Sequence, residues 1–379
     1  MRNQINRLTL TALLLMSSFV VHCATPDSGV VFNKLTDTLY VTMNNQGANV
    51  GMLVGEKAIL LIDAGAKRPG NAQALLKGIR KISNKPIKYV LNTHYHFDHT
   101  GGNPFFAAMG ATIIAQQQMR YSTRPHHLRF KQQFSMSFAG EEISMFHVPG
   151  HTKDSAIVFL SKANALFMGD SYSPDMLMYE GVEGKAGYDQ MVEKAMSLTN
   201  HQSRIIPGHG AISTASDLKR SHEIRDLYRA RVGQLYQKGW SAQRIFEDKQ
   251  TKAILGSGIT YYGLRLPQDI IESNFIKAFE LTSAQLSRFE GVYVSQDGIT
   301  TEIFEEDGKL VIRRQGSFLA ELRAMSATSF DLVGFPFVQQ EEVNFVVSKQ
   351  GAVEKLVLSI PHRFVLNQWI VAGDAVKKP

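Results

Sequence analysis

A short run of histidine and aspartate constrains this chain more than any other feature of its sequence. Residues 93–102 read THYHFDHTGG, and four of the first seven side chains can bind a metal ion. These four are His94, His96, Asp98 and His99. In a helix, with about 100° between successive residues, His96 would point away from His94 and Asp98. In an extended segment His94 and His96 lie on the same side and can share one ion, and a turn at Asp98 and His99 can direct these two toward a second ion.

Three further candidate ligands each follow a stretch that predicts a strand. They are His151, Asp170 and His209, and the expected strands before them are residues 141–148, 165–169 and 204–207. Loops at strand ends gather on one rim of a sheet, where residues far apart in sequence can meet. Histidine nitrogen and carboxylate oxygen are typical ligands of zinc, and manganese or iron also accept them. We therefore expect all seven side chains to form one metal centre.

The order of the expected elements indicates an α/β domain followed by a β domain. Up to about residue 212, stretches typical of strands alternate with helical patterns, and residues 213–281 look mostly helical. Beyond residue 284, short strands recur about every ten residues with turn signals between them. We expect an α/β domain at residues 25–283, in which helices cover the sheets, and a small antiparallel β domain at residues 284–379.

The N-terminus predicts export from the cytoplasm, most simply to a bacterial periplasm. Arg2 and Arg7 precede an uncharged, mostly apolar run at residues 8–21, which is typical of a signal peptide covering residues 1–24. Cys23 is the only cysteine, so the chain can form no disulfide within itself. Cleavage near Ala24 and a lipid anchor on Cys23 are both compatible with this segment.

Together these motifs resemble the metallo-β-lactamase-fold hydrolases, most closely their glyoxalase-II-like and lactonase-like branch. The resemblance covers about residues 30–281, and the motifs that carry it are 62–65, 93–102, 148–152, 169–170 and 207–210. It implies an αββα sandwich with two metal ions at one edge. The C-terminal part resembles the small β domains that are appended to some secreted hydrolases.

The resemblance also implies a role for each candidate residue. His94, His96 and His151 would bind the first metal, whereas Asp98, His99 and His209 would bind the second. Asp170 would bridge the two ions. Asp63 would orient one of the ligand histidines, as the partners of metal ligands commonly do. Asp98 would in addition act as the catalytic residue that orients the nucleophile and carries a proton.

Two positions separate the chain from other branches of the same fold. The zinc β-lactamases have Cys or Ser where this chain has Asp170, which argues against a dedicated β-lactamase. The flavodiiron proteins have Glu where this chain has His96, which argues against the reduction of oxygen or nitric oxide. The complete set of seven ligands makes hydrolysis of an ester-like acyl bond, by a hydroxide that bridges two zinc ions, the leading hypothesis. A thioester, a lactone or, as a side activity, a β-lactam would be the substrate.

Two alternative functions fit the same residues. The first is a phosphodiesterase or sulfatase that uses the same two-metal site, and the second is a non-catalytic binding protein of the cell envelope. The expected partner is a small molecule that is, or becomes, anionic, because two dications outweigh the carboxylates around them. The positive charges behind the formal net charge of +7 are scattered along the chain, and the sequence shows no sign of the additional nucleic-acid-binding domain of the nuclease branches, so we expect no nucleic-acid partner. A lipid anchor on Cys23 would be the only link to a membrane, and no sequence signal fixes the oligomeric state.

Overall fold

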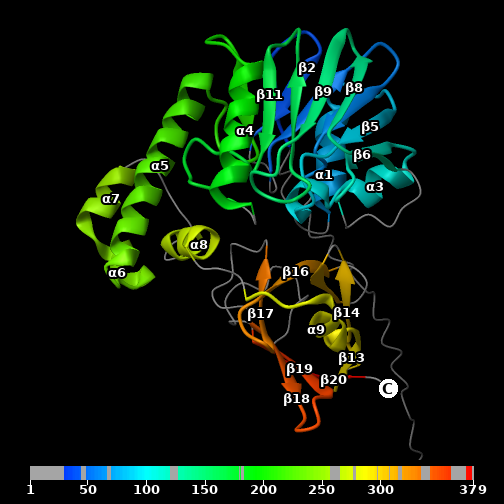
Figure 1. Cartoon of the computed structure of the whole chain (residues 1–379). Helices are drawn as coiled ribbons and strands as arrows, with labels where there is room; N and C mark the ends of the chain where they lie inside the picture. The colour runs from blue at the N-terminus through cyan, green and yellow to red at the C-terminus, as the bar shows by residue number, and fades with distance from the viewer. Residues whose placement is uncertain are drawn as a thin grey trace, which may run out of the picture.

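Two stacked sheets with helices on their outer faces form the upper part of the molecule, and a small β-barrel lies below them (Figure 1). The computed structural model describes residues 30–43, 48–65, 70–119, 127–178, 180, 183–256, 265–275, 279–296, 298–306, 308–314, 318–333, 342–359 and 373–377. The expected signal peptide and Cys23 lie outside these residues. Among the described residues, no helix combines the length and the apolar character needed to cross a membrane.

The first sheet has seven strands that lie side by side in the order of the sequence. They are β1 (Phe32–Lys34), β2 (Leu39–Thr42), β3 (Val50–Val54), β4 (Ile59–Ile62), β5 (Ile87–Leu91), β6 (Thr112–Gln116) and β7 (His127–Phe130). Strands β1 to β4 are antiparallel, and β4 to β7 are parallel. The helices α1 (Asn71–Arg80) and α3 (Asn103–Ala108) connect parallel strands. In α1, Leu75 and Ile79 are four residues apart and are both buried against the sheet.

The second sheet has five strands, in the order β12, β11, β10, β9, β8. Their bounds are β8 (Gln133–Phe138), β9 (Glu141–His147), β10 (Ala156–Leu160), β11 (Ala165–Gly169) and β12 (Arg204–Pro207). Helix α4 (Gly184–Leu198) packs on the outer face through Tyr188 and Met191. Between the sheets, Leu60 and Ile62 of β4 share a buried cluster with Val158 of β10. This αββα arrangement confirms the expected fold class. The sheets also contain β7 and β8, two strands that the sequence patterns did not predict.

A group of helices follows the second sheet, as the sequence predicts for residues 213–281. They are α5 (Ala215–Gln237), α6 (Ala242–Glu247), α7 (Lys249–Leu255) and α8 (Arg265–Asn274). Thr214 begins α5 with a capping box: its hydroxyl accepts from the amide of Asp217, and the Asp217 carboxylate accepts from the amide of Thr214. Two arginines of α5 reach the segment after β11. Arg225 and Arg229 donate to the buried carboxylate of Glu180 at 3.0 and 2.6 Å.

Replacing Glu180 with glutamine should lower the free energy of unfolding by about 3 kcal/mol at neutral pH, because it removes the buried anion that Arg225 and Arg229 share, and Arg229 keeps only the carboxylate of Asp226. Burial raises the pKa of Glu180, but Arg225 and Arg229 outweigh burial and lower it below its usual value. The carboxylate therefore stabilises the fold above its unfolded pKa, and this contribution disappears as the pH falls through the folded pKa. Urea unfolding of both proteins at several pH values should show that the difference between their free energies of unfolding becomes smaller in acid. Glu56→Gln, at an exposed position, should change neither the free energy of unfolding nor its dependence on pH.

The C-terminal part is a closed antiparallel barrel that follows the short helices α9 (Ser283–Leu286) and η1 (Ser287–Phe289). Its strands are β13 (Gly291–Ser295), β14 (Thr300–Glu306), β15 (Lys309–Arg314), β16 (Phe318–Ala324), β17 (Ser329–Val333), β18 (Glu342–Val347), β19 (Val353–Ser359) and β20 (Gly373–Lys377). Phe289, Phe330 and Phe345 pack ring against ring inside it. An antiparallel β domain is therefore confirmed, and closure of the barrel by β13 and β20 goes beyond the sequence prediction.

Candidate metal centre

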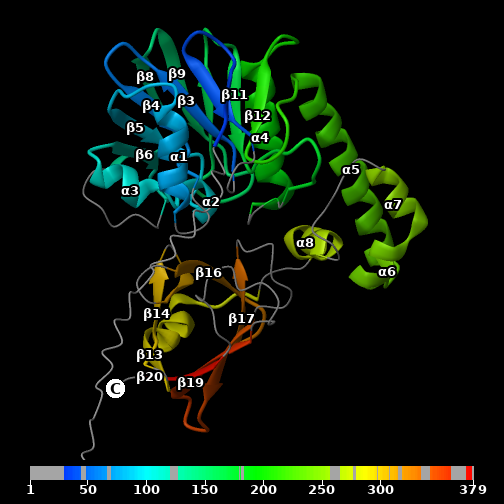
Figure 2. The same ribbon diagram turned by 180° about the vertical axis from the view of Figure 1, so that it is seen from behind.

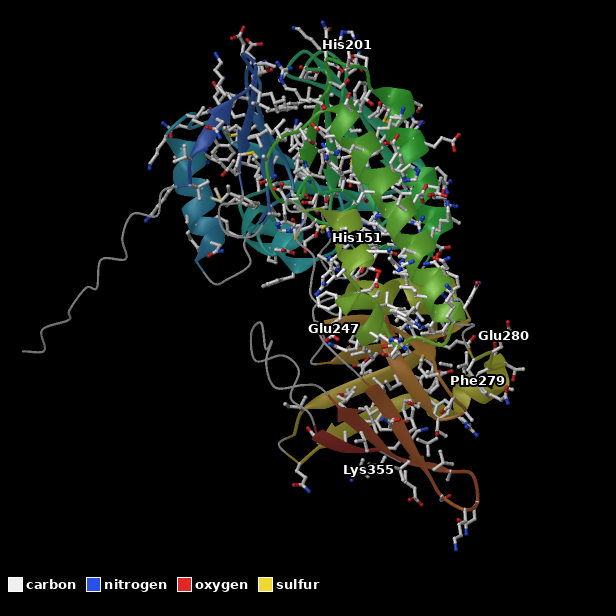
Figure 3. All side chains as sticks on the ribbon, turned by 90° about the vertical axis from the view of Figure 1, so that its left-hand side faces the viewer. His151, His201, Glu247, Phe279, Glu280 and Lys355 are labelled. Carbon is white, nitrogen blue, oxygen red and sulfur yellow. The ribbon has the colours of Figure 1, made fainter. Side chains whose placement is uncertain are left out.

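Seven side chains meet at the edge of the sandwich that faces the barrel. Four strands of the two sheets supply them where each strand ends: β5, β9, β11 and β12. Helix α2 (Phe97–Thr100), which follows β5, lies at this edge in Figure 2, and His151, which follows β9, lies above the barrel in Figure 3. Strands β9, β11 and β12 run in the same direction, so their carboxyl ends lie together. The topology thus brings the seven candidates of the sequence together.

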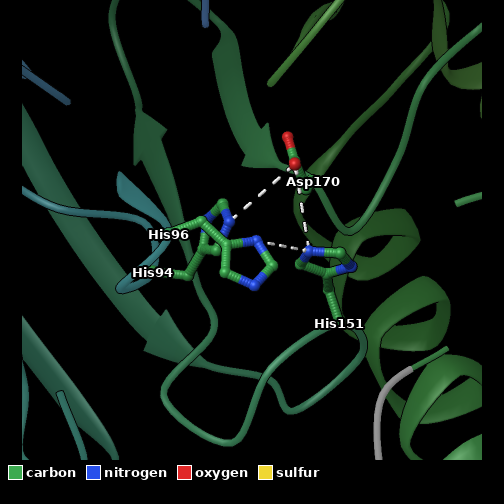
Figure 4. A group of neighbouring side chains, drawn as sticks. All are labelled: His94, His96, His151 and Asp170. Atoms are coloured by element: carbon green, nitrogen blue, oxygen red, sulfur yellow. Dashed lines mark hydrogen bonds and ion pairs between the residues drawn. The ribbon is translucent and has the colours of Figure 1, made fainter. Parts of the chain in front are cut away.

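The first group consists of His94, His96, His151 and Asp170, each of which offers one ligand atom to a common point (Figure 4). Nδ1 of His96 lies 3.1 Å from Nε2 of His151. Oδ2 of Asp170 lies 3.9 Å from Nε2 of His94 and 3.8 Å from Nε2 of His151. Three imidazoles and one carboxylate oxygen that converge in this way form the donor set of a typical zinc site.

The second group consists of Asp98, His99 and His209, and it lies on the other side of Asp170. Oδ1 of Asp170 is 3.1 Å from Nε2 of His99 and 3.3 Å from Nε2 of His209. Asp98 completes the group, because its Oδ2 lies 3.5 Å from Nε2 of His209. Each carboxylate oxygen of Asp170 therefore faces a different group.

The segment that carries the first four candidates differs in one detail from the sequence prediction. His94 and His96 lie before any helix, and His96 has a φ of −54° and a ψ of 141°, but Phe97–Thr100 form one turn of helix, α2, instead of a simple turn. The helical turn places Asp98 and His99 beside the second group, whereas His94 and His96 remain in the first. Gly102 then passes close to the backbone of Ala64, where a Cβ would lie 2.5 Å from the Ala64 carbonyl oxygen. The close return of the chain toward α3 requires this glycine.

Asp63 contacts one of the candidate ligands, His99, and fixes its orientation. It follows β4 and has a φ of 60°, a conformation that few residues other than glycine, asparagine and aspartate adopt. Its Oδ2 lies 2.8 Å from Nδ1 of His99, and its two oxygens accept hydrogen bonds from the amide and the hydroxyl of Thr93. The carboxylate thereby fixes the ring of His99 with Nε2 directed at Asp170. The expected contact between Asp63 and a ligand histidine is present in the structure.

Asp63→Asn should weaken metal binding or turnover by about 10- to 100-fold, the usual effect of removing the partner of a metal ligand. Asparagine tolerates the positive φ of this position, so the backbone should keep its conformation. Competition of the variant with a chelating dye measures the metal dissociation constant. Asp37→Asn, in which the original side chain is fully exposed, is the matched control and should behave like the parent protein. An unchanged dissociation constant and turnover in Asp63→Asn would contradict the role of Asp63.

The local electrostatics separate the histidines into two classes. Burial lowers the pKa of His94 far below its usual value, and burial together with His151 lowers the pKa of His96 to about 3. Burial also acts on His99, but the carboxylates of Asp170 and Asp63 outweigh it and raise the pKa of His99 well above the usual value. His94 and His96 are therefore neutral at pH 7, which is the form of imidazole that binds a metal.

Several buried polar atoms of the centre have no hydrogen-bond partner among the described residues. They are Nε2 of His94, Nε2 of His99 and Oδ1 of Asp170. Buried groups of this kind are rare in folded proteins and usually mark a function or a bound ion. These atoms belong to side chains of the two groups, and a divalent metal ion would supply the missing partners, so the donor set fits one or more such ions.

A second cluster of potential ligands, which the sequence did not suggest, lies between α4 and α5. It consists of Asp189, His222 and Asp226. Lys185 pairs with Asp189, and Arg229 donates to Asp226 at 2.5 Å, so neighbouring cations already balance both carboxylates. We assign no metal to this cluster.

Comparison with known proteins agrees with this geometry. Residues 44–173 match the family model described as the metallo-β-lactamase superfamily. This stretch carries a metallo-β-lactamase superfamily domain. The match contains six of the seven candidates, and His209 lies beyond its end. The αββα sandwich that the superfamily resemblance implied is thus confirmed for this domain.

Curated relatives of the metallo-β-lactamase domain include enzymes. An atrochrysone carboxyl ACP thioesterase from Aspergillus fumigatus is 27% identical over 245 residues, which cover 62% of this chain and 73% of the relative. A β-lactamase-like protein 2 homolog from Caenorhabditis elegans is 28% identical over 175 residues, which cover 44% of this chain and 57% of that protein. These likenesses support an enzyme of the hydrolase type, and the centre of this chain is suited to divalent metal ions.

A solved structure shares the fold over a longer stretch. The sec-alkylsulfatase Pisa1 from Pseudomonas sp. superimposes with a TM-score of 0.55 at 17% identity, covering 68% of this chain and 54% of the sulfatase chain. At this identity the likeness concerns the fold alone. The substrate of the metallo-β-lactamase domain must therefore be argued from its site.

Proposed function

We propose that the protein hydrolyses ester-like acyl bonds with two divalent metal ions, preferably zinc, held by His94, His96, Asp98, His99, His151, Asp170 and His209. The position of Asp170 carries the proposal. Its Oδ2 faces two histidines of the first group at 3.8–3.9 Å, and its Oδ1 faces two histidines of the second at 3.1–3.3 Å. A carboxylate with one oxygen toward each group is suited to bridge two ions. Manganese or iron would fit the same donors.

Ions bound in this site would lower the pKa of a water molecule to near neutrality and polarise the carbonyl oxygen of the substrate. The side chains of Asp98 and His209 are 17% and 16% exposed, whereas that of Asp170 is 4% exposed. Water and substrate therefore reach the centre on the side of Asp98. The Asp98 carboxylate can accept a hydrogen bond from the attacking water and carry the released proton toward the leaving group.

A thioester is the first substrate to test, because the relative named above as a thioesterase aligns with 62% of this chain. A lactone and a β-lactam have the same kind of carbonyl carbon. Sulfate and phosphate esters are the alternative, since the same pair of ions could stabilise their leaving groups. The sulfatase neighbour makes an aryl sulfate a necessary member of the substrate panel.

The test is a panel of substrates on zinc-loaded protein, with the metal content measured on the same sample. It contains a thioester, a homoserine lactone, nitrocefin, bis-p-nitrophenyl phosphate and an aryl sulfate. We expect about two metal ions per chain, as in dinuclear hydrolases, and the highest kcat/KM on the thioester or the lactone. Turnover of the sulfate or the phosphate diester alone would replace the proposal by its alternative. Protein that binds no metal even in excess zinc would refute it.

We also propose that the protein is exported to the periplasm. The charged start and the apolar run at residues 8–21 support this proposal. Mass spectrometry of the mature protein from the native host distinguishes three outcomes. Loss of the first 22 to 24 residues supports export, a diacylglycerol adduct on Cys23 adds a lipid anchor, and a mature chain that begins at Met1 contradicts the proposal.

A further inference from the structure

The barrel contacts the sandwich at the turn that carries His151. Lys153 lies two residues after His151, and its Nζ is 2.5 Å from Oε2 of Glu321 on β16. The other oxygen of the same carboxylate, Oε1, is 2.5 Å from Nζ of Lys309 on β15. The side chain of Glu321 is only 9% exposed, so a shielded carboxylate joins a lysine of each part of the molecule.

Charge and burial make this contact more than a surface ion pair. Burial raises the pKa of Glu321, but hydrogen bonds from Lys153 and Lys309 outweigh burial and lower it. Removing Glu321 would leave Lys153, whose side chain is 21% exposed, without its carboxylate, which costs more than the loss of a fully exposed pair, whereas Glu321 keeps Lys309 when Lys153 is removed. Glu321 therefore holds Lys153 in place.

The backbone around Lys153 transmits this constraint to His151. The Lys153 carbonyl lies 2.7 Å from Nε2 of His147, which therefore acts as the donor. The amide of Thr152 donates to the hydroxyl of Ser155 at 2.8 Å, and the amide of Ser155 donates to the carbonyl of Thr152 at 3.1 Å. Residues 151–155 thus form a tight turn, and a displacement of Lys153 would move the whole turn.

The same turn is connected to the rest of the metal centre. The amide of Ala156 donates to the carbonyl of Thr93 at 2.7 Å, directly before His94. On the other side, Gly150 packs against Met191 of α4, where a Cβ would lie 2.8 Å from the Met191 Cβ. The turn therefore contacts α4, the segment that carries His94, and the barrel. Glu321 is the barrel's contribution to this support.

We propose that Glu321 is a positioning residue of the metal centre: by holding Lys153, it fixes the turn that places His151. The barrel would then help to determine the geometry of the first group of ligands. The effect on turnover rests on the function proposed above, whereas the effect on the turn does not.

Hydrogen exchange of the metal-free protein tests the proposal without any catalysis. Opening the Lys153–Glu321 contact should accelerate amide exchange in the peptide that covers residues 148–155. We expect exchange to become about tenfold faster in Glu321→Gln and in Lys153→Met, since a tenfold change needs only 1.4 kcal/mol of local opening. Lys309→Met is the matched control, because it removes the other partner of the same carboxylate within the barrel, and it should stay within about twofold of the parent protein.

One further variant and one already named keep the test decisive. Lys153→Arg preserves the charge and should restore slow exchange. Lys153→Met leaves the barrel sequence untouched, so it remains informative if Glu321→Gln fails to fold. Parent-like exchange at residues 148–155 in Lys153→Met, or equal acceleration in Lys309→Met, would overturn the proposal.

A second measurement links the turn to the metal. Glu321→Gln should weaken metal binding or lower kcat by about tenfold, the lower end of the effect of supporting groups, with KM within about twofold. The double variant with Lys153→Met should be no worse than either single variant, because both break the same contact. If the parent protein turns over no substrate of the panel, the proposed acyl hydrolysis fails, while the exchange and metal-binding results still decide the role of Glu321.

Discussion

Asp170→Asn should abolish turnover and reduce the affinity for metal at both groups of ligands. Asparagine has nearly the same size, so the variant removes the charge of a side chain that is 4% exposed and leaves its volume unchanged. One oxygen becomes an amide nitrogen, which cannot bind a metal. Whichever group loses its oxygen, one of the two carboxylate charges of the centre, those of Asp98 and Asp170, is gone.

The expected loss in kcat/KM exceeds the roughly 100-fold that removal of a supporting group can cost, because Asp170 touches both groups directly. Steady-state kinetics on the best substrate of the panel and metal analysis of the same sample measure the two effects. Asp37→Asn makes the same chemical change at a fully exposed site and should leave both unchanged. If Asp170→Asn kept two ions and normal turnover, Asp170 could not be the bridging residue.

Gly208→Ala should have a comparably large effect although it adds only a methyl group. A Cβ at this position would lie 2.1 Å from Oδ1 of Asp170 and 2.7 Å from the carbonyl carbon of Gly169. The amide of Gly208 donates to the carbonyl of Gly169 at 2.7 Å, and this hydrogen bond holds the two segments together. The new methyl group must displace Asp170 from the position where it faces both groups of ligands.

We expect Gly208→Ala to lose at least about 100-fold in kcat/KM, since a shift of 1 Å at a catalytic centre has this effect. Gly239→Ala is the control, because Gly239 has a φ of 80° and no atom within 4 Å of its added Cβ. That variant should lose some stability from backbone strain and none of its activity. A Gly208→Ala protein with normal kinetics would show that Asp170 can move without consequence.

The sequence predicted which seven side chains lie together at the edge of the sandwich, and their role as metal ligands remains a prediction. The ligand types occur at strand ends, and the chemistry of metal binding restricts them to few residue types, so their meeting could be expected before the fold was known. The helical turn α2 was not expected, because Phe97–Thr100 is too short for a periodic pattern. The boundary between the two parts at residues 283 and 284 and the signal peptide remain predictions.

Some strands of the barrel could not be predicted, for a different physical reason. Strand β16, FLAELRA, contains alanine, glutamate and arginine, and β20, GDAVK, contains glycine and aspartate, residues that are rare in strands. Pairing with neighbours on both sides outweighs these weak preferences: β20 lies between β13 and β19 and closes the barrel. The contact between Lys153 and Glu321 was likewise invisible, because only the finished fold brings these residues together.

The origin of the ligands from four separate strands has a consequence for biogenesis. His94 and His99 are synthesised long before His209, the last of the seven along the chain. A nascent chain that has emerged only as far as β11 lacks β12, and with it one edge strand of the second sheet. The complete centre therefore cannot form during early synthesis, and tight metal binding should coincide with a late step of folding.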